Sequence, residues 1–248
     1  MAYQATFKRH EIKYLLTQGQ KEAVLAVMEP YMRLDKYGAA TIRNIYMDTD
    51  DFRVIRRSLE KPEYKEKRRI RSSCWATPEA EVFIELKKKY KSVVYKRRLS
   101  LPWEAVEDSF VNGRPLPVDS QIGKEIEYFR SFYDRLRPRI FLSYEREAHF
   151  AVDGSDLRIT FDKNILYREN DLSLCGEIYG NEIMGDGLCL MEIKTSGGMP
   201  LWLSHLLTEQ SLFKTSFSKY GTAYRDMMRR HGSYKWSDYK ERKICYVG

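Results

Sequence analysis

The stretch Leu188-Cys-Leu-Met-Glu-Ile-Lys-Thr-Ser-Gly-Gly198 decides the fold that this sequence predicts. Read as a strand, it places Glu192 and Lys194 on one face and apolar side chains on the other, because side chains alternate with a period of two. The same charged unit occurs again in Glu11-Ile-Lys13 and in Glu85-Leu-Lys87. A half-buried strand with a solvated outer face is the simpler interpretation of any single copy. The charges on the remaining strands favour one explanation that all three copies share.

The composition is that of a folded protein with surplus positive charge. Its 248 residues are 43% hydrophobic, which is enough for a proper core. We expect a single domain over residues 1–232 and a basic, aromatic tail over 233–248. The net charge of +8 predicts an anionic partner.

Other features of the chain exclude several protein classes. It has no run of 18 apolar residues, and its first residues lack the apolar stretch of a signal peptide, so we expect a cytoplasmic protein without a membrane segment. The four cysteines form no C-x-x-C pair and make no metal-ligand spacing with the four histidines, which disfavours zinc. Phosphate-loop, dinucleotide-binding, serine-hydrolase and zinc-protease motifs are all missing.

Periodicity divides the chain into strands and amphipathic helices. We expect strands at 7–15, 41–47, 65–71, 82–90, 93–101, 139–150 and 157–162, besides the stretch at 188–198. Helices are predicted after the capping box of Thr17 and Gln20, from about Asp50, after Pro102, from about Ser120, at Pro200, and from about Ser218 to Gly232. A turn is expected at 36–38 and a loop over 168–187.

The charged faces of these strands carry far more cations than acids. The cations are Arg9, Lys13, Lys65, Lys67, Arg69, Arg71, Lys87, Lys89, Lys96, Arg98, Arg158 and Lys194, and the acids are Glu11, Glu85, Asp162 and Glu192. The opposite faces are apolar and give the amphipathic helices a surface to cover. An antiparallel β-barrel with the charges inside and the helices packed outside satisfies both requirements and removes exposed sheet edges. The predicted fold class is therefore α+β.

A lumen lined in this way calls for a dense polyanion, because its cations repel one another unless an anion fills the space. The few acids suit a magnesium or manganese ion that bridges phosphates, since such an ion takes only one or two protein carboxylates. Glu192 is the first candidate ligand, followed by Glu85 and Glu11. Nucleic-acid binding is the alternative, but it would place the cations on the outer surface.

With these residues in view, the chain resembles the VTC domain, the polyphosphate polymerase branch of the triphosphate tunnel metalloenzyme (CYTH-like) superfamily, from about Phe7 to Tyr224. The motifs are Phe7-x-Arg9-x-Glu11-x-Lys13-Tyr14, Arg69-Ile-Arg71, Phe83-Ile-Glu-Leu-Lys87, Lys96-Arg-Arg98, Arg137-Pro138 with Tyr144-Glu-Arg146, Leu157-Arg-Ile-Thr-Phe-Asp162, Met191-Glu-Ile-Lys194 and Ser216-Phe-Ser-Lys-Tyr220. The resemblance implies that ATP or another nucleoside triphosphate binds in a tunnel and passes its terminal phosphoryl group to a growing polyphosphate chain.

The resemblance also implies roles for individual residues. The catalytic set would be Arg69, Arg71, Lys87, Arg146, Arg158 and Glu192, and further phosphate contacts would come from Lys13, Lys96, Ser218 and Lys219. The charged strand faces add Arg9, Lys89, Arg98 and Lys194 to the candidate phosphate-binding residues. Glu192 would hold the Mn²⁺ or Mg²⁺ ion, with Glu85 and Glu11 as further candidates. Pyrophosphate or polyphosphate would be the other partner, and no nucleic acid is expected.

Two positions depart from the family pattern. Arg9 stands where the wider superfamily has the first Glu of E-x-E-x-K, which disfavours a two-metal triphosphatase. Ser216 stands where eukaryotic catalytic members have a lysine.

No general base is evident, which suits a phosphate acceptor that is already ionised. A tunnel triphosphatase or other nucleotide-processing enzyme and a non-catalytic polyphosphate-binding module remain as alternatives.

Overall fold

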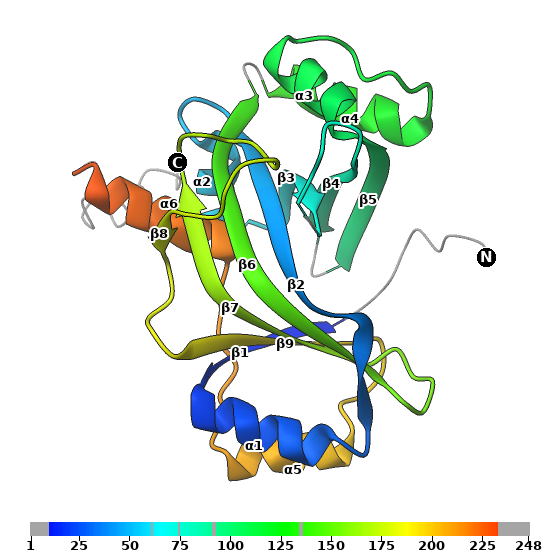
Figure 1. Ribbon diagram of the computed structural model, residues 1–248, viewed down its shortest axis with the longest axis vertical. Coiled ribbons are helices and arrows are strands. Elements are labelled where there is room, and N and C mark those ends of the chain that lie inside the picture. The colour runs from blue at the N-terminus through cyan, green and yellow to red at the C-terminus, as the bar shows by residue number, and fades with distance from the viewer. Residues whose placement is uncertain (1–9, 61, 74, 91–92, 134–135, 233–248) are drawn as a thin grey trace, which may run out of the picture.

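The computed structural model describes residues 10–60, 62–73, 75–90, 93–133 and 136–232 (Figure 1). Arg9 and the tail from residue 233 lie outside the described residues. One curled antiparallel sheet forms the body of the protein, and helices pack against it. The predicted α+β class is confirmed.

The sheet follows an order that differs from the order of the strands along the chain. Its strands run β1 (His10–Thr17), β9 (Leu188–Thr195), β7 (Arg158–Arg168), β6 (Arg137–Ala151), β2 (Met32–Asp48), β3 (Tyr64–Ser72), β4 (Glu81–Tyr90) and β5 (Val93–Pro102). The short strand β8 (Asn181–Glu182) pairs with β7. Among the described residues, β1 and β5 are the two ends of this order, so the sheet curls into a tunnel without closing through backbone hydrogen bonds.

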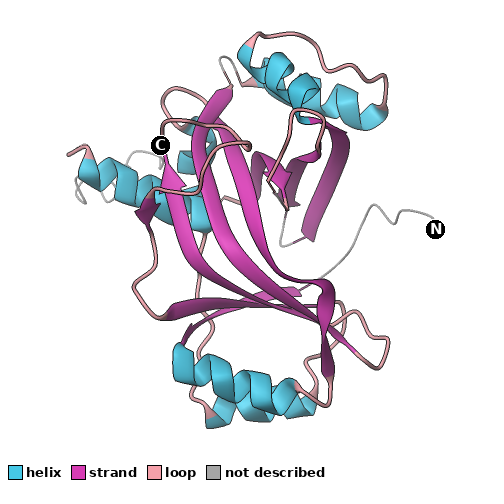
Figure 2. Ribbon diagram, in the orientation of Figure 1, coloured by secondary structure: helices cyan, strands magenta, loops and turns pink. Residues whose placement is uncertain are grey.

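Four helices cover the outer, apolar face of the sheet. α1 (Gln18–Met28) and α5 (Leu201–Glu209) pack on the β1–β9 pair, where Val24 and Leu203 meet Met191 and Ile193. α3 (Trp103–Val111) and α4 (Gln121–Phe132) cover β3 to β5 in the same way. Figure 2 shows these two helical layers at opposite ends of the molecule. Their buried apolar contacts hold the charged face of each strand toward the inside.

The remaining helices, α2 (Arg53–Leu59) and α6 (Lys219–Arg230), form a third core cluster with β2, β6 and β7. Tyr220 of α6 stacks on Tyr46 with a 4.4 Å separation of ring centroids, and its hydroxyl donates to Asp48 at 2.7 Å. Tyr46 accepts a hydrogen bond from Arg69, which lies on the charged face. The start of α6 therefore lies on the inner side of the curled sheet.

Local sequence chemistry explains most of the element boundaries. Thr17 and Gln20 form the predicted capping box of α1, and Ser120 and Ser218 cap α4 and α6 by accepting backbone N–H bonds. The prediction of a turn at 36–38 was wrong, because β2 runs through this segment. Gly38, at φ 58°, lies instead where the register of β2 against β6 shifts. An extra residue in a strand bends it and increases its twist, which suits a curled sheet.

The register brings the predicted charged units opposite one another. Glu11-Ile-Lys13 of β1 pairs with Met191-Glu-Ile-Lys194 of β9 so that Lys13 faces Glu192 and Glu11 faces Lys194. The antiparallel arrangement thus turns two identical units into two opposite-charge pairs. No helix in the described part of the chain is long and apolar enough to cross a membrane.

Candidate phosphate-binding tunnel

The first charged centre of the tunnel surrounds Glu192 on β9. This carboxylate is 5% exposed. Lys194 and Lys219 each approach it to 3.1 Å, Lys13 to 3.4 Å and Arg146 to 3.5 Å. Burial alone would raise the pKa of Glu192, but these cations hold it well below the usual range. A single carboxylate is therefore shared by four cations.

Asp162 on β7 completes this centre. It is fully buried, and it accepts two hydrogen bonds of 2.6 Å from Arg146 in a bidentate pair. Lys219 lies 2.5 Å from the second oxygen of Asp162, so its ammonium group bridges Asp162 and Glu192. Burial opposes the charge of Lys219, but the two carboxylates raise its pKa.

A second centre surrounds Glu85 on β4. The carboxylate is 2% exposed and contacts Arg69 at 2.7 Å, Lys96 at 2.5 Å and Arg98 at 2.8 Å. The cations of β3 and β5 converge on it because Glu85 is the register partner of both Arg69 and Arg98. Burial would raise the pKa of Glu85, but Arg69, Arg71 and Lys96 hold it well below its ordinary value.

Glu11 joins the two ends of the curled sheet. Its oxygens lie 3.2 Å from Lys13 on the same strand and 3.5 Å from Lys87 on β4. Burial would raise the pKa of Glu11, but Lys87, Lys13 and Lys194 lower it to about 2. An ion pair therefore spans the tunnel between β1 and β4, where the strands themselves do not pair.

Arg71 has neutral partners in place of a carboxylate. It donates to Asn44 at 3.2 Å and to the Tyr144 hydroxyl at 2.9 Å. The Tyr144 ring in turn lies against Arg146 and Lys219, with their charged groups 5.1 and 4.6 Å from its centroid. Alternation alone could not have identified Asn44 and Tyr144, because only the pairing of β2 with both β3 and β6 brings them to Arg71.

The start of α6 contributes the Ser218 hydroxyl and the N-terminus of the helix to the tunnel. Ser218 accepts from the N–H of Gly221 as the helix cap, and it also accepts from Lys67 on β3 at 2.9 Å. Lys13 donates to the carbonyl of Phe217 at 3.0 Å. Helix N-termini favour anions, so Ser218 and Lys219 offer an anion site that faces the cations of β1 and β3.

The predicted residues divide into groups according to where the structure places them. The tunnel face brings together Glu11, Lys13, Arg69, Arg71, Glu85, Lys87, Lys96, Arg98, Arg146, Glu192, Lys194, Ser218 and Lys219. Lys89 lies farther along the same face, opposite Lys65. Arg158 is the register partner of Lys194, but its guanidinium lies 3.9 Å from Asp35 and over the Phe150 ring. Arg9 falls outside the described residues.

The donor set limits how a metal ion could bind. Among the described residues, no group of three or more His, Cys, Asp or Glu side chains could hold one. Glu11 and Glu192 do converge, since Lys13 lies within 3.4 Å of both. Two carboxylates on paired strands fit an ion that takes its other ligands from phosphates and water. Glu85 fits less well, because among the described residues none of the cations that pair with it also pairs with a second carboxylate.

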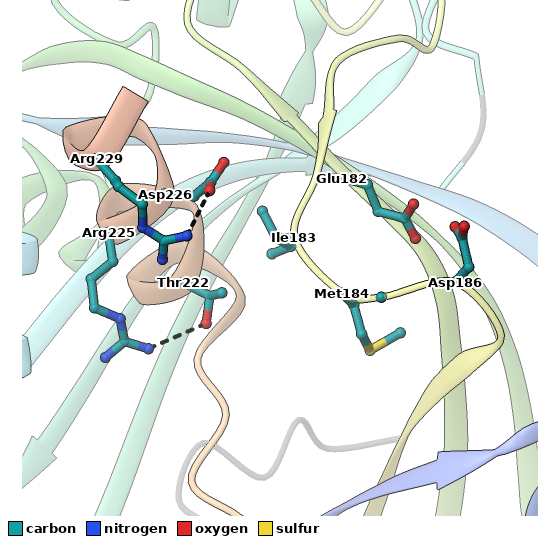
Figure 3. Close-up of a pocket in the computed structure, with 9 residues that line it drawn as sticks. Glu182, Ile183, Met184, Asp186, Thr222, Arg225, Asp226 and Arg229 are labelled. Atoms are coloured by element: carbon teal, nitrogen blue, oxygen red, sulfur yellow. Dashed lines mark hydrogen bonds and ion pairs between the residues drawn. The ribbon is translucent and has the colours of Figure 1, made fainter. Parts of the chain in front are cut away.

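A separate pocket of about 470 Å³ lies beside α6, outside the tunnel (Figure 3). Arg225 and Arg229 of α6 line one side of it, and Glu182 and Asp186 line the other. None of the residues that line it belongs to the predicted site. The tunnel, and not this pocket, is therefore the candidate functional site.

The chain matches one protein family and resembles solved structures. The model of the VTC domain family matches residues 8–228. A protein from Bacillus halodurans, described as a putative adenylate cyclase, is 14% identical with a TM-score of 0.54, covering 87% of this chain and 96% of that chain. A second, from Vibrio parahaemolyticus and described in the same words, is 11% identical with a TM-score of 0.47, covering 89% and 99%. No curated protein matches the chain.

Proposed function

Because the chain belongs to the VTC domain family, we propose that it is a metal-dependent polyphosphate polymerase. It transfers the terminal phosphoryl group of ATP to a growing polyphosphate chain inside the tunnel. The observation that carries this proposal is the surplus of cations around each buried carboxylate. Four cations share Glu192 and three share Glu85, so the ion pairs leave positive charge for a phosphate chain to neutralise.

Each part of the tunnel has a role in this reaction. Arg69, held by Glu85, and Arg71, held by Tyr144, present planar guanidinium groups suited to bidentate phosphate contacts. Lysines such as Lys87 and Lys96 add point charges that can follow a moving phosphoryl group. Phosphoryl transfer depends mainly on such positioning and charge neutralisation.

The proposed metal position is at Glu192, with Glu11 beside it. A bound Mn²⁺ or Mg²⁺ ion would neutralise charge on the phosphate oxygens and orient them. Lys13, which lies between the two carboxylates, holds them in place in the ligand-free protein. Glu85 serves in this proposal to orient Arg69 and Arg98.

The direct test is to incubate the pure protein with ATP and Mn²⁺ or Mg²⁺ and to resolve the products by gel electrophoresis and phosphorus NMR. Long phosphate chains together with ADP are expected. Phosphate without chains would indicate a tunnel triphosphatase. Binding of polyphosphate without any consumption of ATP would leave a non-catalytic binding module.

A further inference from the structure

Lys67 occupies an unusual position among the tunnel cations. It lies in the middle of β3, directly opposite Lys87 of β4, and like charges in register destabilise a strand pair. Its half-buried ammonium group donates to Ser218 at the start of α6. In this position it links the phosphate-facing strands to the helix N-terminus. Its spacing places it among the cations of the predicted lumen, but neither the family motifs nor the proposed roles above assign it a function of its own.

The surroundings of Lys67 are cationic on every side. Lys65 and Arg69 flank it on β3, Lys87 and Lys89 face it from β4, Lys13 approaches from β1, and Lys219 follows Ser218 on α6. Several of these neighbours have a carboxylate of their own, namely Glu85 for Arg69, Glu11 for Lys87, Glu11 and Glu192 for Lys13, and Asp162 and Glu192 for Lys219. Within the described part of the chain, no carboxylate forms an ion pair with Lys67.

The proton on Lys67 is consequently held weakly in the ligand-free protein. Burial, followed by repulsion from Lys87, Lys13 and Lys65, lowers the pKa of Lys67 to about 7. At pH 8 such a group is about nine-tenths deprotonated, and an anion beside it reverses this balance by favouring the charged form.

We propose that Lys67 is an additional phosphate-binding residue of the tunnel and that it takes up a proton from solvent when a triphosphate or polyphosphate binds. The inference rests on the proposed function only in that a phosphate chain enters the tunnel. The phosphate chain supplies the counter-charge that no side chain of the described residues provides, and the protonated Lys67 holds it next to the N-terminus of α6. By linkage, a ligand that favours the protonated form binds more tightly at lower pH.

The test is isothermal titration calorimetry of the metal-free full chain with inorganic tripolyphosphate. Titrations at pH 8 in two buffers of different ionisation enthalpy give the number of protons taken up. Lys67→Arg is the matched variant, since it keeps the positive charge but does not titrate in this range. Protonation of the ligand and of other side chains is common to both proteins, so the difference between them isolates Lys67.

The parent is expected to take up about 0.5 more proton than Lys67→Arg at pH 8. Its affinity should also fall relative to the variant, by up to about tenfold in all between pH 7 and pH 9. Lys67→Met should bind about tenfold more weakly at pH 6.5 and nearly normally at pH 9. Lys163→Met, which removes an exposed cation paired with Glu145 outside the tunnel, controls for net charge.

Equal proton uptake by the parent and Lys67→Arg would overturn the inference, and this comparison stands even if Lys67→Met does not fold. Failure of the proposed function looks different. A parent protein that shows the extra proton uptake but never consumes ATP would refute the polymerase and support the inference. A parent that turns over ATP with no difference in uptake would refute the inference alone. Absence of tripolyphosphate binding would refute both.

Discussion

At the scale of single residues, Glu192 has two proposed effects that a substitution can separate. Its carboxylate holds the metal ion, and it competes with phosphate for the cations around it. Glu192→Gln keeps the shape of the side chain but removes the carboxylate proposed to hold the metal. Loss of that charge should lower turnover by at least about a hundredfold, or roughly 2–3 kcal/mol of transition-state stabilisation. Metal-free affinity for tripolyphosphate should remain or increase, because the four cations around Glu192 lose their competing carboxylate. Rate assays with ATP and calorimetry with tripolyphosphate measure the two effects.

The matched control for Glu192→Gln is Glu147→Gln. Glu147 also pairs with a buried lysine, at 2.8 Å from Lys21, but on the outer face of the sheet. Both variants remove one partner of a partly or fully buried pair, which costs up to about 3–5 kcal/mol of stability. Only Glu192→Gln should lose turnover. Normal turnover in Glu192→Gln would transfer the metal site to Glu11 or Glu85.

The two arginines of β3 should respond differently to substitution. Arg69 is bound to Glu85, whereas Arg71 donates to the neutral groups of Asn44 and Tyr144. In the proposed enzyme, Arg71→Ala should lower the rate of chain synthesis far more than the affinity for preformed polyphosphate, which many other cations still hold. Steady-state rates and polyphosphate affinity for Arg71→Ala and Arg69→Ala test this. In a simple binding module, each variant would only weaken affinity by a similar step.

At the scale of elements, α6 depends on a buried hydrogen bond for its position. Tyr220→Phe removes the hydroxyl that donates to the buried Asp48, which costs about 1–2 kcal/mol. Because Tyr220 directly follows Lys219, affinity for tripolyphosphate should also fall several-fold. Tyr167→Phe is the control, since that hydroxyl donates to Asp226 farther along the same helix. Thermal unfolding and calorimetry measure both quantities, and an equal loss of affinity in the two variants would contradict the coupling.

Alternation in the sequence predicted which side chains face the tunnel, because the helices that cover the apolar face leave each strand only one orientation. Strand order was not predictable in this way, since nothing local specifies that β1 pairs with β9. The error at 36–38 has a similar origin. A glycine with positive φ serves a β-bulge as well as a turn, and only the pairing of β2 with β6 distinguishes them.

The candidate site was predictable to a similar extent. The charged face of each strand could be read from its spacing, including Lys67 and Asp162, which the resemblance assigned no role. The convergence of Lys219 on both Asp162 and Glu192 could not be predicted from spacing, because it depends on how α6 docks on three distant strands. The same holds for Tyr144, whose hydroxyl accepts from Arg71 of β3 and whose ring contacts Lys219 of α6 and Arg146 of its own strand.

At the scale of the whole molecule, the negative charge of the buried tunnel carboxylates offsets part of the positive charge of a larger number of cations. The carboxylates Glu11, Glu85 and Glu192 have lowered pKa values in the folded state, so the stability they contribute is present above pH 4.5 and is lost as the pH falls from there. Acid therefore removes the negative charges first and leaves the cations unbalanced. The ligand-free protein should unfold more readily at pH 3 than at pH 6.

On the alkaline side, loss of charge stabilises the folded protein, whereas on the acid side it destabilises it. The pKa values of Lys67 and Lys96 are lowered to about 7 from 10.5, chiefly by burial, so the unfolded chain binds more protons than the folded chain between these values. The unfolding free energy of the ligand-free protein should therefore rise between pH 7 and pH 9, by about 1 kcal/mol after allowance for solvent screening. Stabilisation by tripolyphosphate should shrink over the same range, because the ligand must restore the lost protons. Urea unfolding at pH 6.5 and 9, with and without tripolyphosphate, measures both trends.

Lys67→Arg should flatten the alkaline rise and leave the acid limb unchanged, since its charge persists at pH 9. A ligand-free stability that falls steadily from pH 7 to pH 9 would show that the tunnel cations are balanced without a bound anion.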